Sequence, residues 1–187
     1  MFIGTPPNLS KIPNLESFSG EERSIFYAPV ECMNIALNKT VTSSDDMPII
    51  GEIELITDGI KEAPDGYYVE LAPMIQYITI DLEQECEIYA VIMWHYHKQP
   101  RVYKDVIVQL SSDPDFIEFE IIFNNDFDNS SGMGIGEDLQ YIESYNGKLI
   151  DAKGKKARYV RCWSNGNNEN DLNNYIEVSV YGRIINE

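Results

Sequence analysis

A short run of ring-bearing and basic side chains, Trp94-His95-Tyr96-His97 followed by Arg101, is the part of the sequence best equipped for chemistry. An imidazole and a guanidinium can hydrogen-bond neighbouring hydroxyl groups while an aromatic ring stacks on the C–H face of a sugar. Other loops add further candidates for binding such a ligand, namely Tyr67, Tyr68, Asn125, Trp163 and Asn165. The alternative is that Trp94 belongs to the core and that the two histidines pair with nearby carboxylates.

Metal ions are the alternative ligands for two segments. His95 and His97 would point both imidazoles to one side of an extended chain, but no cysteine or third histidine completes a zinc or copper site. The run Asp126-Phe127-Asp128-Asn129-Ser130, with Glu137 beyond it, superficially follows a calcium-loop pattern. Ser131 stands where such a loop needs glycine for its sharp turn, so the sequence favours a hydrogen-bonded loop over an EF-hand-like site.

Catalytic motifs are missing from the sequence, which contains no G-x-S-x-G elbow, no P-loop and no H-E-x-x-H. A hydrolase would need two carboxylates facing each other across a cleft, about 5 to 10 Å apart. With 31 acidic residues in the chain, the presence of a carboxylate pair is uninformative. We therefore expect a protein without enzymatic activity.

Short strands must position these side chains, because period-two alternation dominates from Asn34 onward. The alternation is clearest over 77–82 and over 88–94, with the polar run 83–85 between the two predicted strands. In the second of them it places on one face Ile88, Ala90, Ile92 and Trp94. Further strands are predicted over 103–110, 117–123, 157–163 and 175–181, and 124–136 is predicted as a surface loop. The pattern predicts an all-β fold, an antiparallel β-sandwich.

Composition limits the partners of the chain. Its 187 residues, 43% of them hydrophobic, predict one folded domain with a core. The formal charge of −17 repels phosphate backbones and anionic lipid headgroups, so nucleic acid and membrane are not expected partners. No apolar run approaches the roughly 20 residues that a membrane span needs. Neutral sugars and calcium ions remain compatible with this charge.

The first 33 residues read differently from the rest. They are rich in proline and lack periodicity, which predicts an irregular N-terminal arm (1–33) packed along a domain of residues 34–187. The stretch Met1–Pro7 lacks the basic start and apolar stretch of a signal peptide, and we expect a leader to have been trimmed from an exported precursor. Cys32, Cys86 and Cys162 allow at most one disulfide, and the latter two are expected to fill the core.

Five short motifs occur in order between residues 34 and 183. They are N-I-A-L-N-K-T-V-T at 34–42, I-T-D-G at 56–59, I-T-I-D-L at 78–82, A-R-Y-V-R at 157–161 and Y-I-E-V-S-V-Y-G at 175–182. Together they resemble the coagulation factor 5/8 type C (discoidin) domains, which share the galactose-binding-like jelly roll with family 32 carbohydrate-binding modules. The chain departs from that pattern where Tyr77 or a neighbour replaces the usual tryptophan, and it lacks the terminal cysteine pair of the blood-clotting members.

The resemblance implies a non-catalytic carbohydrate-binding module of an extracellular or periplasmic protein, with the glycan at the strand-end loops. It also implies a structural calcium ion, held by Asp58 of the D-G turn, by Glu177 of the closing strand and by nearby carbonyls. The alternative is that Asp58 only caps its turn and Glu177 faces solvent. Since this fold also hosts protein binders, the alternative function is an interaction or assembly domain that docks onto neighbouring domains of a larger exported protein.

Overall fold

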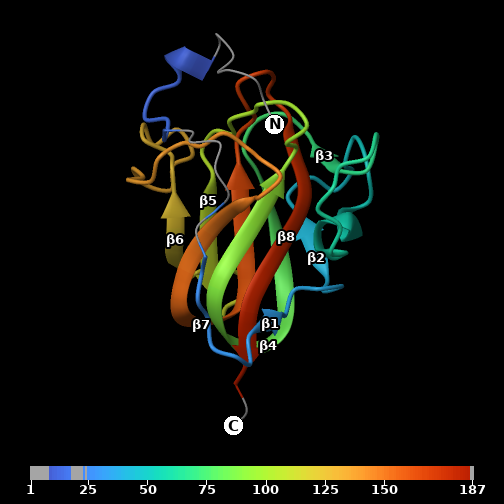
Figure 1. The fold of residues 1–187 in the computed structure, drawn as a ribbon, viewed down its shortest axis with the longest axis vertical. Coiled ribbons are helices and arrows are strands. Elements are labelled where there is room, and N and C mark those ends of the chain that lie inside the picture. Colours follow the sequence, from blue (N-terminus) through green and yellow to red (C-terminus); the bar gives the residue numbers. More distant parts are fainter. Residues whose placement is uncertain (1–8, 18–22, 24, 186–187) are drawn as a thin grey trace.

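The computed structural model describes residues 9–17, 23 and 25–185, and strands account for nearly all of their regular structure (Figure 1). Two short 3-10 helices are η1 (Leu9–Lys11) and η2 (Ile53–Thr57). The strands are β1 (Met33–Asn34), β2 (Val41–Ser43), β3 (Val69–Leu71), β4 (Gln76–His95), β5 (Ile107–Ser111), β6 (Glu120–Asn124), β7 (Lys148–Ser164) and β8 (Asn173–Ile184). Every pair of these strands is antiparallel, so the predicted antiparallel β-sandwich is confirmed.

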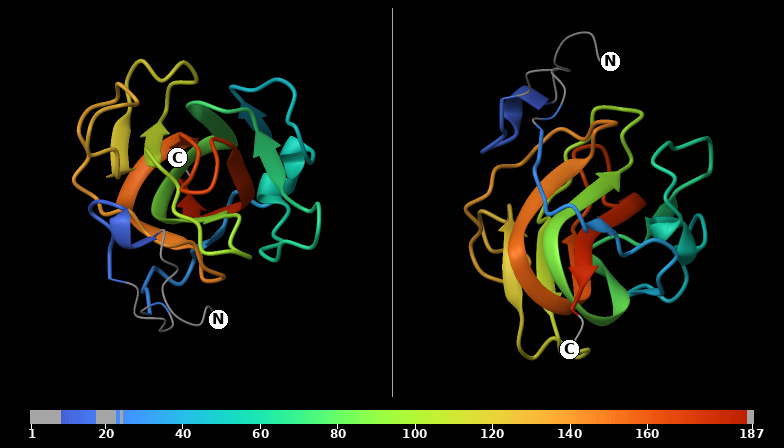
Figure 2. Two further views of the ribbon diagram at one scale, coloured as in Figure 1. Left: turned by 90° about the horizontal axis from the view of Figure 1, so that it is seen from above. Right: turned by 60° about the horizontal axis from the view of Figure 1, so that its bottom comes forward.

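The strands form one continuous sheet that folds over on itself. Its order is β1-β8-β4-β7-β5-β6, with β2 added to β4 and β3 added to β8. The first half of β4 pairs with β2 and with the end of β7, whereas its second half pairs with β8 and with the start of β7. The long strands curve strongly, as Figure 2 shows, so that β4 and β7 run through both layers of the sandwich.

Strand β4 corrects the prediction of two separate strands with a turn at 83–85. Pairing with β7 continues across the bend, with register shifts between Asp81 and Cys86 and between Ile88 and Ala90. A bulge of this kind bends a strand without ending it. The second shift also changes which side chains share a face, since Ile88 packs in the main core with Val91 and Met93. The face predicted from strict alternation is therefore wrong beyond Ile88, because one inserted residue inverts the order of side chains.

The remaining strands differ from prediction mainly in their ends. Strand β7 begins already at Lys148, and β5 begins only at Ile107 because residues 103–106 form an irregular entry to the strand. The core between the layers includes Ile78 and Ile80 of β4 beside their cross-strand partners Cys162 and Val160 of β7. All three cysteines are free, and Cys86 and Cys162 are buried in this core as predicted.

The described part of the arm lies along the domain. Leu9 is buried with Val102 and Ile142, and Leu15 forms a bridge to Gln140. The predicted boundary at residue 33 falls inside β1, which pairs with the end of β8. Met1–Pro7 lies outside the described residues. Across residues 9–17, 23 and 25–185, we find no helix with the length and apolar character to span a membrane.

Candidate functional site

Loops from three parts of the chain meet where β4 ends and β8 begins, at the top of Figure 1. Tyr96 and Arg101 follow β4, Tyr68 and Glu70 lie at β3, and Asn174 lies at the start of β8. The guanidinium carbon of Arg101 is 4.5 Å from the centroid of the Tyr96 ring, and the Tyr68 and Tyr96 centroids are 5.1 Å apart. We call these five residues the tyrosine–arginine site.

Hydrogen bonds fix the polar half of this site. Arg101 Nη1 donates to Asn174 Oδ1 at 2.8 Å, and Asn174 Nδ2 donates to Glu70 Oε2 at 2.7 Å. Burial, and next the negative charge of Glu70, raise the pKa of the Tyr68 hydroxyl. A cation with spare N–H donors, a carboxylate acceptor and two half-buried rings are the groups that orient a hydroxyl-rich ring.

Arg101 is not neutralised by a carboxylate in the described part of the chain, where the ion pairs involve other basic residues. Its Nε is buried and unpartnered, although Nη1 is bonded. The protein has more than twice as many acidic as basic side chains, so a guanidinium without a carboxylate partner is unusual in it. Such a group can donate hydrogen bonds to a ligand. The sequence run that contains Arg101 thus contributes to the candidate ligand site.

His95 takes a different place from the one expected. It is fully buried, with Nδ1 2.7 Å from Glu143 Oε1, and its ring stacks on Tyr103 at 4.2 Å and lies 4.8 Å from Tyr175. The pairing with a carboxylate, which the sequence left open, is the one observed. The side chain points inward because it shares a face of β4 with the core residues Val91 and Met93. His95 therefore belongs to the core next to the tyrosine–arginine site and cannot contact a ligand.

His97 and Tyr67 brace the loops beside the site. His97 Nε2 lies 2.9 Å from the backbone carbonyl of Lys61, which ties the segment after β4 to the loop before β3. Tyr67 donates its hydroxyl hydrogen bond to Asp58 Oδ2 at 2.7 Å. His95 and His97 have separate partners, so the two imidazoles do not converge as the zinc or copper alternative requires.

The other three candidates lie apart from the tyrosine–arginine site. Asn125 is buried, and its Oδ1 accepts from the Val106 N–H at 2.7 Å. Trp163 packs on Tyr77 with ring centroids 4.5 Å apart, and its Nε1 donates to Gln109. Asn165 Nδ2 donates to Asp105 Oδ2 at 2.7 Å and lines a separate cavity. The structure therefore divides the nine predicted ligand residues among several environments.

The two predicted calcium ligands are neighbours. The fully buried Glu177 carboxylate accepts from the Gly59 N–H at 3.1 Å and from the Ser179 hydroxyl at 3.0 Å. Burial raises the pKa of Glu177 to about 7, and the negative charge of Asp58 adds to the shift. Asp58 accepts from the Ile60 N–H and from Tyr67. A buried carboxylate beside a second one, with no ion pair of its own among the described residues, fits a hard cation such as calcium. The reading in which Glu177 faces solvent is wrong.

The loop after β6 is built by side-chain hydrogen bonds, as the sequence favoured. Asp126 accepts from the N–H groups of Ser130 and Ser131, which is an Asx-type arrangement. Carboxylate oxygens of Asp105, Asp126 and Asp128 lie within 4.8 Å of one another. Burial raises the pKa of Asp105, and hydrogen bonds from Asn165 and Ser130 partly oppose that effect.

Sequence reasoning missed Glu70, Asn174 and Glu143. Glu70 lies on β3, which was not predicted as a strand, and its backbone pairs with Asn174. Asn174 sits in the run Asn170–Asn174, where nothing in the sequence distinguishes it from its neighbours. Glu143 lies outside every predicted element, and its N–H donates to the Arg101 carbonyl at 2.8 Å. These residues become functional candidates only through the chain pairings that surround them.

The fold matches those of solved carbohydrate-binding modules. The family 32 module of AlyQ, in complex with 4,5-unsaturated mannuronic acid, matches with a TM-score of 0.55 at 22% identity over 75% of this chain and 92% of that one. Chitosan-binding module 1 of a chitosanase/glucanase from Paenibacillus sp. IK-5 matches at TM-score 0.56 and 19% identity, over 80% of this chain and 99% of that one. The fucose-binding module SpX-3 of Streptococcus pneumoniae matches at TM-score 0.57 and 21% identity, over 80% and 97%.

No family profile and no curated protein matches the sequence. The chain nevertheless has the galactose-binding-like fold of the family 32 modules, and the architecture implied by the five sequence motifs is confirmed. These three matches cover 92%, 99% and 97% of the modules' own chains.

Proposed function

We propose that this chain is a non-catalytic carbohydrate-binding module that receives a glycan at the tyrosine–arginine site. The observation that carries the proposal is the unneutralised Arg101 guanidinium, held by Tyr96 and Asn174 at the strand-end loops. Rings and a charged donor gathered at a loop-built edge are typical of sugar-binding sites. The three structural relatives bind a uronate, chitosan and fucose, which supports the ligand class and leaves the particular sugar to experiment.

Glycan-array screening followed by isothermal titration calorimetry tests this function. A sugar that binds the wild type should bind Arg101→Ala much more weakly. Tyr27→Ala is a matched surface control, because Tyr27 is 86% exposed on the arm. Equal binding by the wild type and by Arg101→Ala would contradict the proposed site, and absence of binding to any glycan would contradict the function.

We also propose that Asp58 and Glu177 hold one structural calcium ion. The ion would add a positive charge between these neighbouring carboxylates and would fix the D-G turn to β8 through Gly59 and Glu177. Export to an extracellular or periplasmic space, where free calcium is abundant, accords with this site. Metal analysis of the purified protein and a calcium titration monitored by thermal unfolding test it, with Glu177→Gln as the variant.

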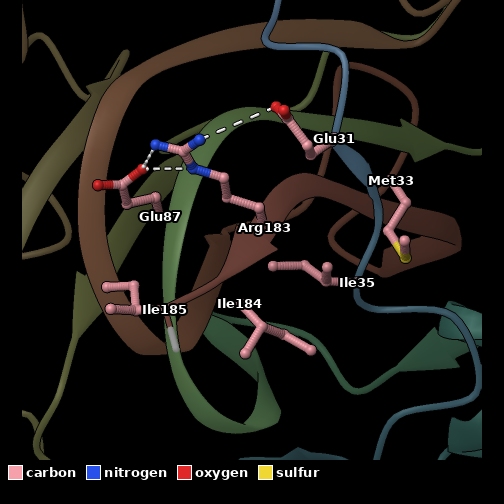
Figure 3. A pocket seen from close by; sticks show the side chains of 7 residues that line it. All are labelled: Glu31, Met33, Ile35, Glu87, Arg183, Ile184 and Ile185. Atoms are coloured by element: carbon pink, nitrogen blue, oxygen red, sulfur yellow. Dashed lines mark hydrogen bonds and ion pairs between the residues drawn. The ribbon is translucent and has the colours of Figure 1, made fainter. Parts of the chain in front are cut away.

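One observation favours the second candidate, a protein-interaction or assembly domain. The arm carries exposed apolar side chains at Ile25, Tyr27 and Val30, which are 79%, 86% and 98% exposed. Nearby, at the opposite end from the tyrosine–arginine site, a cavity of about 550 Å³ is lined by isoleucines and by Arg183 between Glu31 and Glu87 (Figure 3). Sedimentation at several concentrations, with Tyr27→Ser as the variant, tests whether this surface associates with a second copy.

A further inference from the structure

A cavity distinct from the one in Figure 3 opens at the same end of the domain as the tyrosine–arginine site, on the other side of the segment that carries Arg101. Its volume is about 510 Å³, and its walls come from arm residues 11–13, from 102–105 after β4, from 127–130 and from the loop 165–171. Figure 2, seen from above, shows the arm helix η1 on the side opposite to the loop before β3. We call this space the arm cavity. Its size falls within the roughly 300 to 1,000 Å³ usual for ligand pockets.

Packing makes the arm a fixed wall of this cavity. Leu9 is 1% exposed and packs on Val102 and Ile142, so the first turn of the arm is anchored in an apolar cluster of its own. The N–H of Glu16 donates to the Gln140 carbonyl at 2.8 Å. The arm is therefore fixed to the domain at Leu9 and again at Glu16, on either side of the residues that line the cavity. The cavity is thus formed before any ligand binds.

The opposite wall is tied down equally well. The Val102 N–H donates to Asn168 Oδ1 at 2.7 Å, and the Lys104 N–H donates to the Gly166 carbonyl at 3.1 Å. Asn165 and Ser130 both donate to the Asp105 carboxylate, at 2.7 and 2.8 Å. These bonds connect the loop after β7 to the segment after β4 and fix the spacing of the polar groups.

The exposed groups of the arm cavity match a hydroxyl-rich ring. Phe127 presents an aromatic ring that is 37% exposed, and Lys11 and Lys104 supply N–H donors. Asp128 and Asp171 supply acceptors from the same wall region. The lining also includes Asp105, so three carboxylates stand against two ammonium groups. One stacking surface with donors and an excess of acceptors suits a neutral polyhydroxylated ligand better than an anion.

We propose that the arm cavity is a second sugar-binding site, separate from the tyrosine–arginine site and completed by the N-terminal arm. The ligand class rests on the proposed function, whereas the second site consists of residues outside the tyrosine–arginine site. The arm is then part of the binding surface as well as a connecting segment. Because Arg101 and Lys104 are three residues apart, the two sites lie within about 10 Å along the chain.

Titration calorimetry of the full chain with mannuronate oligosaccharides, chitosan oligosaccharides and fucose tests this inference. For a probe that binds, we expect two sites in the wild type, and Phe127→Ala or Lys104→Ala should weaken one of them about tenfold while leaving the other. Arg101→Ala should do the reverse. Tyr27→Ala, an exposed aromatic on the arm away from the cavity, is the control and should leave both sites unchanged.

The outcomes separate the two proposals. A single site that Arg101→Ala removes and that Phe127→Ala and Lys104→Ala leave intact would overturn the second site and leave the proposed function standing. A single site that responds only to the Phe127 and Lys104 variants would support the arm cavity and overturn the tyrosine–arginine site. Binding of none of the three probes would overturn both. Phe127 is a partly exposed side chain, so its replacement is compatible with folding, which a thermal melt of the variant checks.

Discussion

Removing the charge of Glu177 should change how the stability of this protein depends on pH and on calcium. The carboxyl is fully buried, and its pKa of about 7 in the folded protein stands against an ordinary value of 4.5. Between these two values the folded state binds more protons than the unfolded state, so stability falls as pH rises from about 4.5 to above 7. At about 1.4 kcal/mol per unit, the loss reaches about 3 kcal/mol.

Calcium should reverse this loss, because a bound cation favours the ionised carboxylate that burial penalises. The effect of calcium should therefore be larger at about pH 8 than at about pH 5. For a domain of this size, about 3 kcal/mol corresponds to a shift of roughly 6 to 12 °C in the unfolding midpoint. Asp58 contributes a second charge to the same site and should amplify the response.

Urea unfolding at about pH 5 and about pH 8, with calcium or with a chelator, measures the effect, and Glu177→Gln is the comparison because it keeps the shape and removes the charge. In the chelator, the wild type should lose about 2.5 kcal/mol more than the variant between the two pH values. Calcium should stabilise the wild type and leave the variant nearly unchanged. Equal pH slopes in the two proteins, or equal stabilisation by calcium, would refute the reasoning.

Three further substitutions follow from the structure. Arg101→Ala should weaken glycan binding roughly tenfold to a hundredfold by calorimetry, with little change in thermal stability, because a charged donor at the ligand is lost. Gly147→Ala should cost about 2 to 4 kcal/mol in urea unfolding, since its φ is +67° and a Cβ would lie 2.5 Å from the nearest tryptophan ring. Gly132→Ala, at φ +77° with open space around it, is the matched control and should cost only about 1 kcal/mol. Glu143→Ala should cost about 1 to 3 kcal/mol because it leaves the buried His95 Nδ1 without its hydrogen-bond partner, and an unchanged urea midpoint would contradict the buried contact.

Much of the fold could be predicted from local patterns in the sequence. Alternation along 77–82 reports which residues face a core, because successive side chains of a strand point to opposite faces. Along 175–181 an extra residue interrupts it, since Tyr175 and Val178 lie in the main core and Ile176 lies in a separate cluster. That rule fails where a residue is inserted, and the shift between Ile88 and Ala90 inverts the faces of the second half of β4. Nothing in the sequence marks the insertion, since the inserted position is set by pairing with β7 and β8.

The candidate site was predictable only in part. The run after β4 supplied Tyr96 and Arg101, because aromatic and basic residues at a strand end are conspicuous in any sequence. Their partners Glu70 and Asn174 come from strands far away in the chain, and pairing between β3 and β8 brings them together. The same run also led to a wrong expectation for His95. It was predicted to contact the ligand, but its position on β4 places it in the core.

The sequence by itself determined the all-β class, the architecture of the fold and the residue types available at the loop end. Those properties depend on composition, on period-two alternation and on motifs that are local in the chain. Tertiary structure alone decided which of those residues reach the surface together, which carboxylates are buried side by side and that the arm forms a wall. The physical reason is that strand register and packing between distant segments, set by the whole core at once, fix the direction of each side chain.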